Sequence, residues 1–321
     1  MIDVRWFAPN RFALQIVPEL RRLGLTVATE GDVPARLALA MSGTVAEAAW
    51  RYGATQRCPL VLYVWDLPPW SVGAGEPDPV WWVLNRFVRI PRLGHRYPER
   101  RGYYSRLHFI AARARAVWAP SASSAQTVTT RFGVTCRRMP YCYDSDRFAP
   151  LARVRAEPTY LVSVSRLQRY KNQEAVIRAA ARLEPRLPVR LVGEGPAEQD
   201  LRRLAADLGV SCSIESGLSD ADVARAYREA SVAVCPSRFE GFGLSPLEAI
   251  ACATPVVASD IPAHREFANG AARFFPLDDD AGLVAAISAA LAGPPPDPAA
   301  IQSLTITAAA ERFAAGLAEL L

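Results

Sequence analysis

The sequence predicts an α/β fold made of two doubly wound, Rossmann-like domains that face each other across a central cleft. Strand-like and helix-like segments alternate along both halves of the 321-residue chain. Alternation of this kind is typical of right-handed βαβ units around a parallel sheet. The length suggests about two domains, and a hydrophobic content of 50% is typical of a folded globular chain.

The first half, residues 1–150, is predicted to form an N-terminal, Rossmann-like domain. The run Pro59–Val64 is apolar throughout, as expected for a strand buried on both faces of a parallel sheet. The other strands are expected at 2–8, 25–28, 37–41, 116–120 and 137–141, and the helices at 11–23, 44–52 and 121–132. A polar, proline-containing linker then ends near Pro158.

The second half restarts the alternation and is predicted to form a second domain over residues 151–298. Strands are expected at 160–164, 189–192, 211–214, 232–235, 255–258 and 272–275, and helices at 172–183, 198–208, 221–229 and 281–292, with a further helix that begins at about 244. The stiff segment Pro294–Pro298 precedes a C-terminal helix in residues 299–321. We expect this helix to pack back towards the N-terminal domain.

Charge and cysteine content limit the environment and the partners. Residues 1–150 carry 20 arginines against 11 acidic residues, whereas residues 151–321 have a net charge of −4, so the two halves should meet different partners. The six cysteines form no CxxC pair and are typical of a reducing compartment. No signal peptide or membrane-spanning run is apparent, which predicts a cytoplasmic protein.

One stretch, Ser237–Ala249, carries the strongest pattern. A short apolar run leads through Gly241 and Gly243 into a predicted helix, with Ser245 expected as its N-cap. Free N–H groups at a helix start form an anion site, most naturally for phosphate. Glu240 and Glu248 bracket the loop and could accept hydrogen bonds from sugar hydroxyls, as in a nucleotide sugar. Alternatively, the glycines only turn the chain and both carboxylates are solvated.

A second polar loop, Ser165–Asn172, follows the predicted strand 160–164. Arg166 and Lys171 could neutralise a diphosphate and stabilise it as a leaving group; the alternative is that both form surface ion pairs. Lys171 is the only lysine beside 36 arginines, which indicates a position that needs a compact ammonium. Asn172 is expected to be the N-cap of the next helix.

Two features of the first half leave alternatives open. Asp66 follows the strand 59–64, where a catalytic or substrate-contacting carboxylate could lie, although Asp66 could also cap a turn before Pro68. Arginine and aromatic residues alternate over 81–115. This region could be a solvated face, a surface for anionic lipid or an anionic acceptor, or a nucleic-acid site. Glu240 and Glu248 argue against nucleic acid, because carboxylates repel its phosphates.

Together these motifs resemble the retaining glycosyltransferases of family 4, which have the GT-B architecture. The similarity is carried by three segments and is continuous from about 140 to 280: Ser165-Arg166-Leu-x-x-x-Lys171-Asn172, Leu191–Pro196 and Glu240-Gly-Phe-Gly-Leu-x-x-x-Glu248. The last is the family's E-x7-E motif. Ala8–Arg11 and Ser165 stand where the family often has glycines.

The resemblance implies specific roles: residues 1–150 would form the acceptor-binding domain and residues 151–298 the nucleotide-sugar donor domain. Arg166 and Lys171 would bind the donor diphosphate, Glu248 the ribose and Glu240 the sugar, with Asp66 as a further catalytic candidate. Backbone groups would complete the donor site. Those expected at the phosphate or sugar are Phe242, Gly243 and Leu244, and those expected at the base are Gly193, Gly195, Gly217 and Leu218.

The expected protein is therefore a glycosyltransferase that moves a sugar from a nucleotide-sugar donor to a glycan or lipid-linked acceptor with retention. No metal or cofactor is expected, and the base is unknown. Region 81–115 would contact an anionic membrane at its inner face. The alternatives are a GT-B epimerase or phosphorylase, an inactive sugar-binding homologue, or an arginine-rich nucleic-acid-binding protein. A phosphorylase would need a cofactor lysine, and the single lysine is already placed at the diphosphate.

Overall fold

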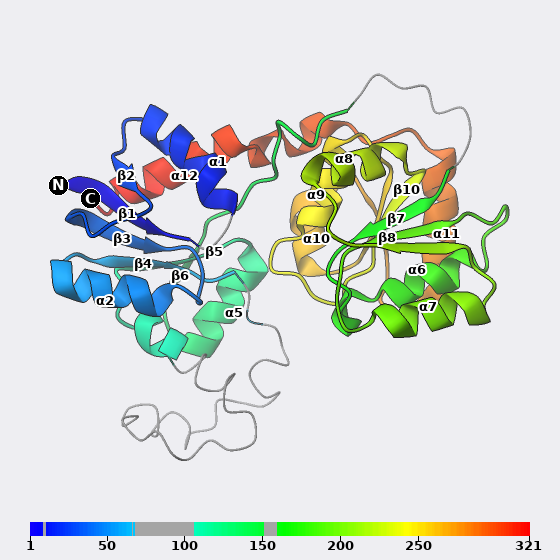
Figure 1. Ribbon diagram of the computed structural model, residues 1–321, viewed down its shortest axis with the longest axis horizontal. Helices are drawn as coiled ribbons and strands as arrows, with labels where there is room; N and C mark the ends of the chain where they lie inside the picture. The colour runs from blue at the N-terminus through cyan, green and yellow to red at the C-terminus, as the bar shows by residue number, and fades with distance from the viewer. Residues whose placement is uncertain (9–10, 66, 68–105, 151–158) are drawn as a thin grey trace, which may run out of the picture. The chain divides into compact units, whose positions relative to one another are not determined.

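The computed structural model describes residues 1–8, 11–65, 67, 106–150 and 159–321, except for the side chains of 11–14. These residues form two compact units, each built on a six-stranded parallel sheet, which confirms the predicted α/β class (Figure 1). Unit 1 comprises Met1–Tyr141 and Ile306–Leu321, and unit 2 comprises Cys142–Thr305. The sequence places domain limits at 150 and 298, and these limits stay a prediction.

The sheet of unit 1 has the strand order β2-β1-β3-β4-β5-β6, and every neighbouring pair is parallel. Its strands lie close to the predicted positions. They are β1 (Ile2–Phe7), β2 (Val27–Ala28), β3 (Ala35–Ala40), β4 (Leu60–Tyr63), β5 (Ala116–Ala119) and β6 (Cys136–Arg138).

Helices cover both faces of this sheet. Helices α2 (Ala46–Gln56) and α5 (Ala122–Phe132) share one apolar cluster with the strands. Helices α1 (Arg11–Arg22) and α12 (Ile306–Ala318) lie on the other side (Figure 1). There Phe313 of α12 is fully buried and its ring contacts those of Trp6, Tyr63 and Trp118. The last helix is therefore part of the core of unit 1.

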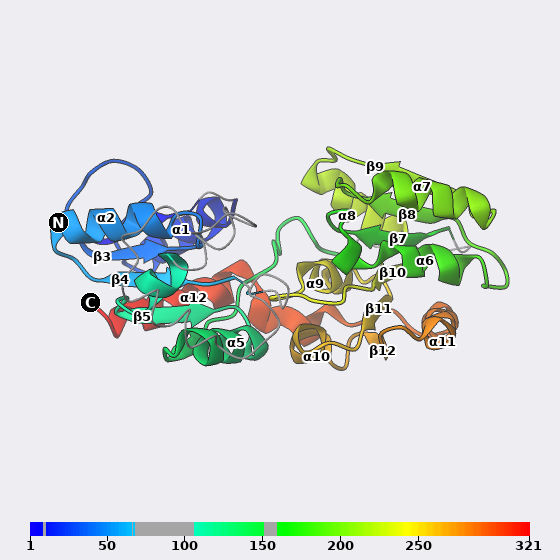
Figure 2. The same ribbon diagram turned by 90° about the horizontal axis from the view of Figure 1, so that it is seen from below.

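The sheet of unit 2 has the order β12-β11-β10-β7-β8-β9, again parallel throughout, and Figure 2 shows the six strands in this sequence. The order places the first strand of the unit, β7, beside β10 in the middle of the sheet. The strands are β7 (Leu161–Val164), β8 (Val189–Val192), β9 (Cys212–Glu215), β10 (Val232–Cys235), β11 (Val256–Ser259) and β12 (Arg273–Phe275).

Both faces of the second sheet are also covered by helices. Helices α6 (Gln173–Ala180), α7 (Glu198–Asp207) and α11 (Asp280–Ala292) pack into one apolar cluster with the strands. Helices α8 (Asp220–Glu229), α9 (Leu244–Ala251) and α10 (Pro262–Ala268) pack together with the 3₁₀ helix η3 (Pro298–Leu304). The sequence did not predict η3. No helix in the part of the chain that the structure describes could cross a bilayer.

The loop after β8 passes very close to the loop after β7. Gly193 and Gly195 adopt φ values of 147° and 154°, which residues with a side chain rarely adopt. A Cβ at Gly193 would lie 2.0 Å from the Ser165 carbonyl oxygen, and one at Gly195 would lie 2.3 Å from that of Leu167. Glycine is therefore required at both positions for the two loops to approach.

We predict that Gly193→Ala lowers the free energy of unfolding by at least about 3 kcal/mol, since it adds steric overlap to a strained φ. Gly217→Ala is the matched control. Gly217 has a φ of 69°, and a Cβ there would meet nothing within 4 Å, so only about 1 kcal/mol should be lost. Urea denaturation of the two variants measures the difference. Equal losses would contradict the close approach of the loops.

Candidate functional site

The predicted donor residues in unit 2 follow the carboxyl ends of four neighbouring strands. In the sheet these strands lie in the order β9-β8-β7-β10. The residues expected at the base follow β9 and β8, those expected at the diphosphate follow β7, and Glu240, expected at the sugar, follows β10. Carboxyl ends of parallel strands share one edge of a sheet, which is where such folds bind ligands. The structure therefore brings these residues to one edge. Asp66 lies outside the described residues.

Two loops at the centre of this edge are joined to each other. We call residues 165–172, after β7, the cation loop, and residues 236–243, after β10, the carboxylate loop. The backbone N–H of Arg238 donates to the carbonyl of Tyr170 at 2.8 Å, and the side chain of Asn172 donates to the carbonyl of Pro236 at 3.2 Å. The loops thus pair with each other although 64 residues or more separate the bonded groups.

Lys171 and Glu240 meet where the two loops pair. The Lys171 ammonium donates to Glu240 Oε1 at 2.6 Å, and the two side chains are only 13% and 17% exposed. Two N–H groups of the ammonium remain for other acceptors, and Oε2 of the carboxylate remains for a hydroxyl donor. Because the pair is partly buried, its electrostatic interactions are screened less than those of a surface ion pair.

The backbone carbonyl of Arg166 accepts a hydrogen bond, whereas its side chain is exposed. Gln173 Nε2 donates to Ser165 Oγ at 2.7 Å and to the Arg166 carbonyl at 2.9 Å, which braces the start of the cation loop. The exposed guanidinium of Arg166 donates to the Tyr170 hydroxyl at 3.1 Å. Among the described residues this guanidinium forms no ion pair.

The start of α9 differs from the prediction. Ser245 is not the N-cap. Gly243 takes that position with a φ of 90°, and the helix begins at Leu244. The Ser245 hydroxyl instead donates to the carbonyl of Val164 at 2.7 Å, which ties α9 to the end of β7. The Phe242 ring is buried against Phe267, so the side chain of Phe242 serves the core.

Asn172 also differs from its predicted role. It occupies the N-cap position of α6 but makes no side-chain cap hydrogen bond, and its φ of 58° is left-handed. Its amide is turned to Pro236 instead. Nothing in the sequence around Asn172 indicates this contact, because Pro236 is far along the chain.

Glu248 lies in α9, one turn beyond Leu244, and is partly buried. The Tyr227 hydroxyl lies 3.5 Å from Glu248 Oε2. Complete burial, reinforced by the nearby Glu248 carboxylate, raises the pKa of Tyr227 well above its ordinary value. Tyr227 therefore keeps its proton and can donate a hydrogen bond to the carboxylate.

His264, in the first turn of α10, lies beneath the carboxylate loop and is 1% exposed. Nδ1 lies 3.0 Å from the Ser259 carbonyl, which can only accept, so Nδ1 carries the proton. Nε2 is buried and has no hydrogen-bond partner among the described residues. A Cβ at Gly243 would approach the ring to 3.0 Å.

The acidic pairs that could suggest a metal have other partners. Asp144 accepts hydrogen bonds from the N–H groups of Asp146 and Arg147. Asp279 is the N-cap of α11, where its side chain accepts from the N–H of Gly282, and Asp278 pairs with Arg238. Within the described ranges, no group of three or more His, Cys, Asp or Glu residues is placed to hold a metal ion.

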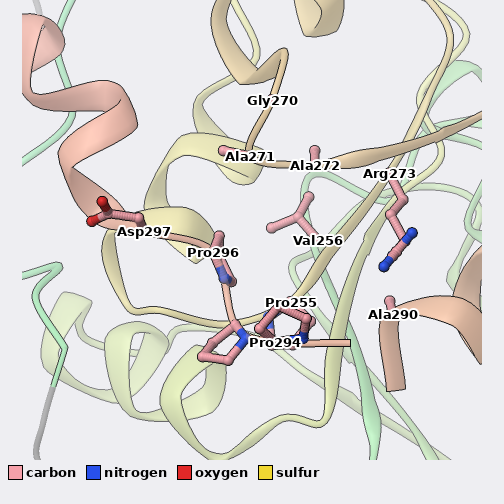
Figure 3. Close-up of a pocket in the computed structure, with 11 residues that line it drawn as sticks. Pro255, Val256, Gly270, Ala271, Ala272, Arg273, Ala290, Pro294, Pro296 and Asp297 are labelled. Atoms are coloured by element: carbon pink, nitrogen blue, oxygen red, sulfur yellow. The ribbon is translucent and has the colours of Figure 1, made fainter. Parts of the chain in front are cut away.

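A surface pocket of about 330 Å³ lies at the opposite edge of the second sheet (Figure 3). Val256 and Arg273, which begin β11 and β12, line it together with the segment 294–297. The beginnings of parallel strands lie at the edge away from the carboxyl ends. None of the predicted donor residues lines this pocket, and it is separate from the candidate site.

The buried state of His264 should make stability depend on pH. Burial lowers the pKa of His264, partly offset by the nearby Glu240 carboxylate, so the folded ring stays neutral where the unfolded ring binds a proton. The free energy of unfolding should fall as the pH drops from 7.5 to 5.5, by up to about 1.4 kcal/mol per pH unit for each excluded proton. We predict a smaller fall for His264→Gln.

Urea titrations across this range measure the effect. Burial also lowers the pKa of His108, which is still present in His264→Gln. His108→Gln is the control, and it should remove only the part of the pH dependence that His108 causes. Identical pH dependence in the wild type and His264→Gln would contradict a neutral buried ring.

Comparison with known proteins agrees with this geometry. Residues 147–303 match the profile of the family described as Glycosyl transferases group 1. A D-inositol 3-phosphate glycosyltransferase of Geodermatophilus obscurus is 34% identical over 211 residues, covering 57% of this chain and 47% of that protein. A GDP-mannose-dependent alpha-(1-6)-phosphatidylinositol monomannoside mannosyltransferase of Mycolicibacterium smegmatis is 36% identical over 141 residues, 37% of either chain. The chain thus spans less than half the length of these relatives.

Similarity to solved structures extends over the whole chain. HepE of Anabaena, solved with UDP-glucose, has a TM-score of 0.70 at 16% identity and covers 100% of both chains. Sucrose-phosphate synthase of Thermosynechococcus elongatus has a TM-score of 0.62 at 20% identity, with 89% of this chain and 69% of that one covered. The chain therefore has the GT-B form of the α/β fold, and its residues 147–303 match the group 1 glycosyltransferase profile.

Proposed function

We propose that this protein is a glycosyltransferase that moves a sugar from a nucleotide-sugar donor to an acceptor hydroxyl, with retention and without a metal. The contact between Lys171 and Glu240 carries this proposal. It joins a cation suited to a diphosphate with a carboxylate suited to a sugar hydroxyl, at the ligand-binding edge of the sheet. The match of residues 147–303 to the group 1 family supports the same function.

The strand order suggests how a donor would lie. Its base would lie by Gly193, Gly195, Gly217 and Leu218, and its ribose would donate to Glu248. Its diphosphate would meet Arg166, Lys171 and the N–H groups of Phe242, Gly243 and Leu244, while its sugar would reach Glu240. Positive charge from two side chains and a helix start would stabilise the leaving diphosphate.

In the proposed reaction, the bond between the anomeric carbon and the diphosphate oxygen breaks. A bond to the acceptor oxygen forms on the same face of the sugar, which retains the anomeric configuration. The acceptor proton passes to the departing phosphate oxygen. Asp66 remains a proposed catalytic residue on the acceptor side.

The acceptor is proposed to be a glycan, a polysaccharide or a glycolipid. Two relatives are named for inositol-containing acceptors, one of them lipid-linked. The arginine-rich first half suits an acceptor that carries negative charge. We also propose that the protein acts in the cytoplasm at the inner face of a membrane.

We predict that one of UDP-, GDP-, ADP- or dTDP-linked sugars raises the melting temperature and is hydrolysed or transferred. Lys171→Met and Glu240→Gln should each lower kcat/KM for this donor at least about 100-fold, since each removes charge complementary to the transition state. Arg166→Gln should weaken donor binding. Thermal-shift measurements and product analysis by mass spectrometry test the three variants.

Arg186→Gln provides the control, because Arg186 is exposed and precedes β8, away from the candidate site. It should leave kcat/KM unchanged, and EDTA should leave the rate unchanged as well. If no nucleotide sugar binds or turns over, or if Lys171→Met and Glu240→Gln remain fully active, the proposal fails.

Membrane contact is proposed through region 81–115, of which residues 81–105 lie outside the described residues. The described part, a helical segment at 106–111, carries Phe109, which is 45% exposed. The guanidinium of Arg113 lies 3.7 Å from the centre of the Phe109 ring, and Arg106 is exposed on the same segment. An exposed aromatic ring beside arginines suits the interface of an anionic bilayer.

We predict that the protein sediments with vesicles of phosphatidylcholine containing 30 mol% of an anionic lipid and stays in solution with phosphatidylcholine alone. Replacing Arg106 and Arg113 together with glutamine should reduce the bound fraction, because each cation near the surface contributes about 1 kcal/mol. Arg186→Gln is again the control. Sedimentation that does not depend on anionic lipid would refute the membrane contact.

A further inference from the structure

Asn172 lies directly between Lys171 and α6, and the proposed donor contacts do not include it. Its side chain is 3% exposed, and its Nδ2 donates to the carbonyl of Pro236. Its Oδ1 is buried and has no hydrogen-bond partner among the described residues. A buried polar side chain at this point needs a reason, because leaving a buried acceptor unpaired lowers the stability of the folded state.

The bond from Asn172 is one of three that connect the cation loop with the carboxylate loop. Asn172 pairs with Pro236 and Tyr170 pairs with Arg238, so the two segments run in opposite directions, as in an antiparallel pair. Lys171 lies between the two bonded residues of its loop and forms the third link, to Glu240. The backbone on both sides of Lys171 is therefore tied to the loop that carries Glu240.

The residue type at 172 has to satisfy two conditions. A φ of 58° is left-handed, and asparagine is one of the few residues other than glycine that adopts it readily. The side chain must also bring an N–H donor to a buried carbonyl, which glycine and aspartate cannot do. The N–H of Asn172 closes the 3₁₀ turn to Arg169 at 3.1 Å, so its backbone bond does not depend on the side chain.

We propose that Asn172 is a positioning residue of the donor site. By tying the cation loop to Pro236, its amide holds the Lys171 ammonium within hydrogen-bonding distance of Glu240. This inference rests on the proposed function, in which these two side chains bind the donor. Asn172 thus contributes to donor binding and transfer only by positioning Lys171 against Glu240.

A double-mutant cycle on unfolding tests the inference without any donor. Melting temperatures are measured for Lys171→Met, Glu240→Gln and the double variant, first with Asn172 present and then with Asn172→Gly. With Asn172 present, we expect the single shifts to be non-additive by about 2–4 °C, a coupling typical of residues in direct contact. Asn172→Gly keeps the left-handed backbone but removes the side chain. In this background the melting-temperature shifts of Lys171→Met and Glu240→Gln should be additive.

Two further variants separate positioning from general stability. Asn172→Asp has nearly the same shape but no N–H donor, and it should abolish the coupling as Asn172→Gly does. Val189→Ala removes two methyl groups from a buried side chain at the opposite edge of the sheet, and it should lower the melting temperature while preserving the coupling. Coupling that survives both Asn172 variants, or that Val189→Ala also abolishes, would overturn the inference.

Kinetics adds a second readout. With the nucleotide sugar that gives the largest thermal shift, Asn172→Gly should lower kcat/KM roughly tenfold, because a displaced charged group is less well aligned. In the Glu240→Gln variant, Asn172→Gly should lower kcat/KM little further. A further tenfold loss of kcat/KM in that variant would contradict action through the charge pair. If no nucleotide sugar binds the wild type, the proposed function fails, whereas the unfolding cycle still decides the role of Asn172.

Discussion

The pairing of β7 with β10 is the constraint on which the candidate site depends. Both strands are parallel, and Ala233 lies opposite Val162. Their loops therefore leave the sheet at the same edge, one strand spacing of roughly 4.8 Å apart. At this distance the loops can share hydrogen bonds, and Lys171 meets Glu240 across 69 positions of sequence. Without that neighbour relationship, the two motifs would be separate surface loops.

The charge pair also resolves a conflict within the motif. A carboxylate beside a phosphate site is repelled by the ligand it is meant to help bind. In this structure the ammonium of Lys171 lies against Glu240, so positive charge is already present beside the carboxylate. The neutral ring of His264 beneath Gly243 adds no further charge to the loop. The site thus combines both charges in one partly buried contact.

The two units differ in how far their sequence resembles that of known proteins. The family match stops at 303, whereas similarity of fold extends over the full length at 16% identity. Unit 1 is held by its own packing, with Phe313 of the last helix among three aromatic rings of the sheet. Many residue combinations can fill such a core, because volume and pattern matter more than identity. A loop that binds a charged ligand tolerates fewer changes.

The sequence by itself determined the α/β class, most strand positions and the two loops of the candidate site, because alternating apolar runs, glycines and charged loops are local signals. Local signals could not predict which carbonyl the side chain of each expected cap residue would bond. Ser245 and Asn172 were expected to cap helices, but they bind Val164 and Pro236, which are distant in the chain. Only the tertiary structure decided these contacts and the burial of His264, because they depend on which strands become neighbours in the sheet.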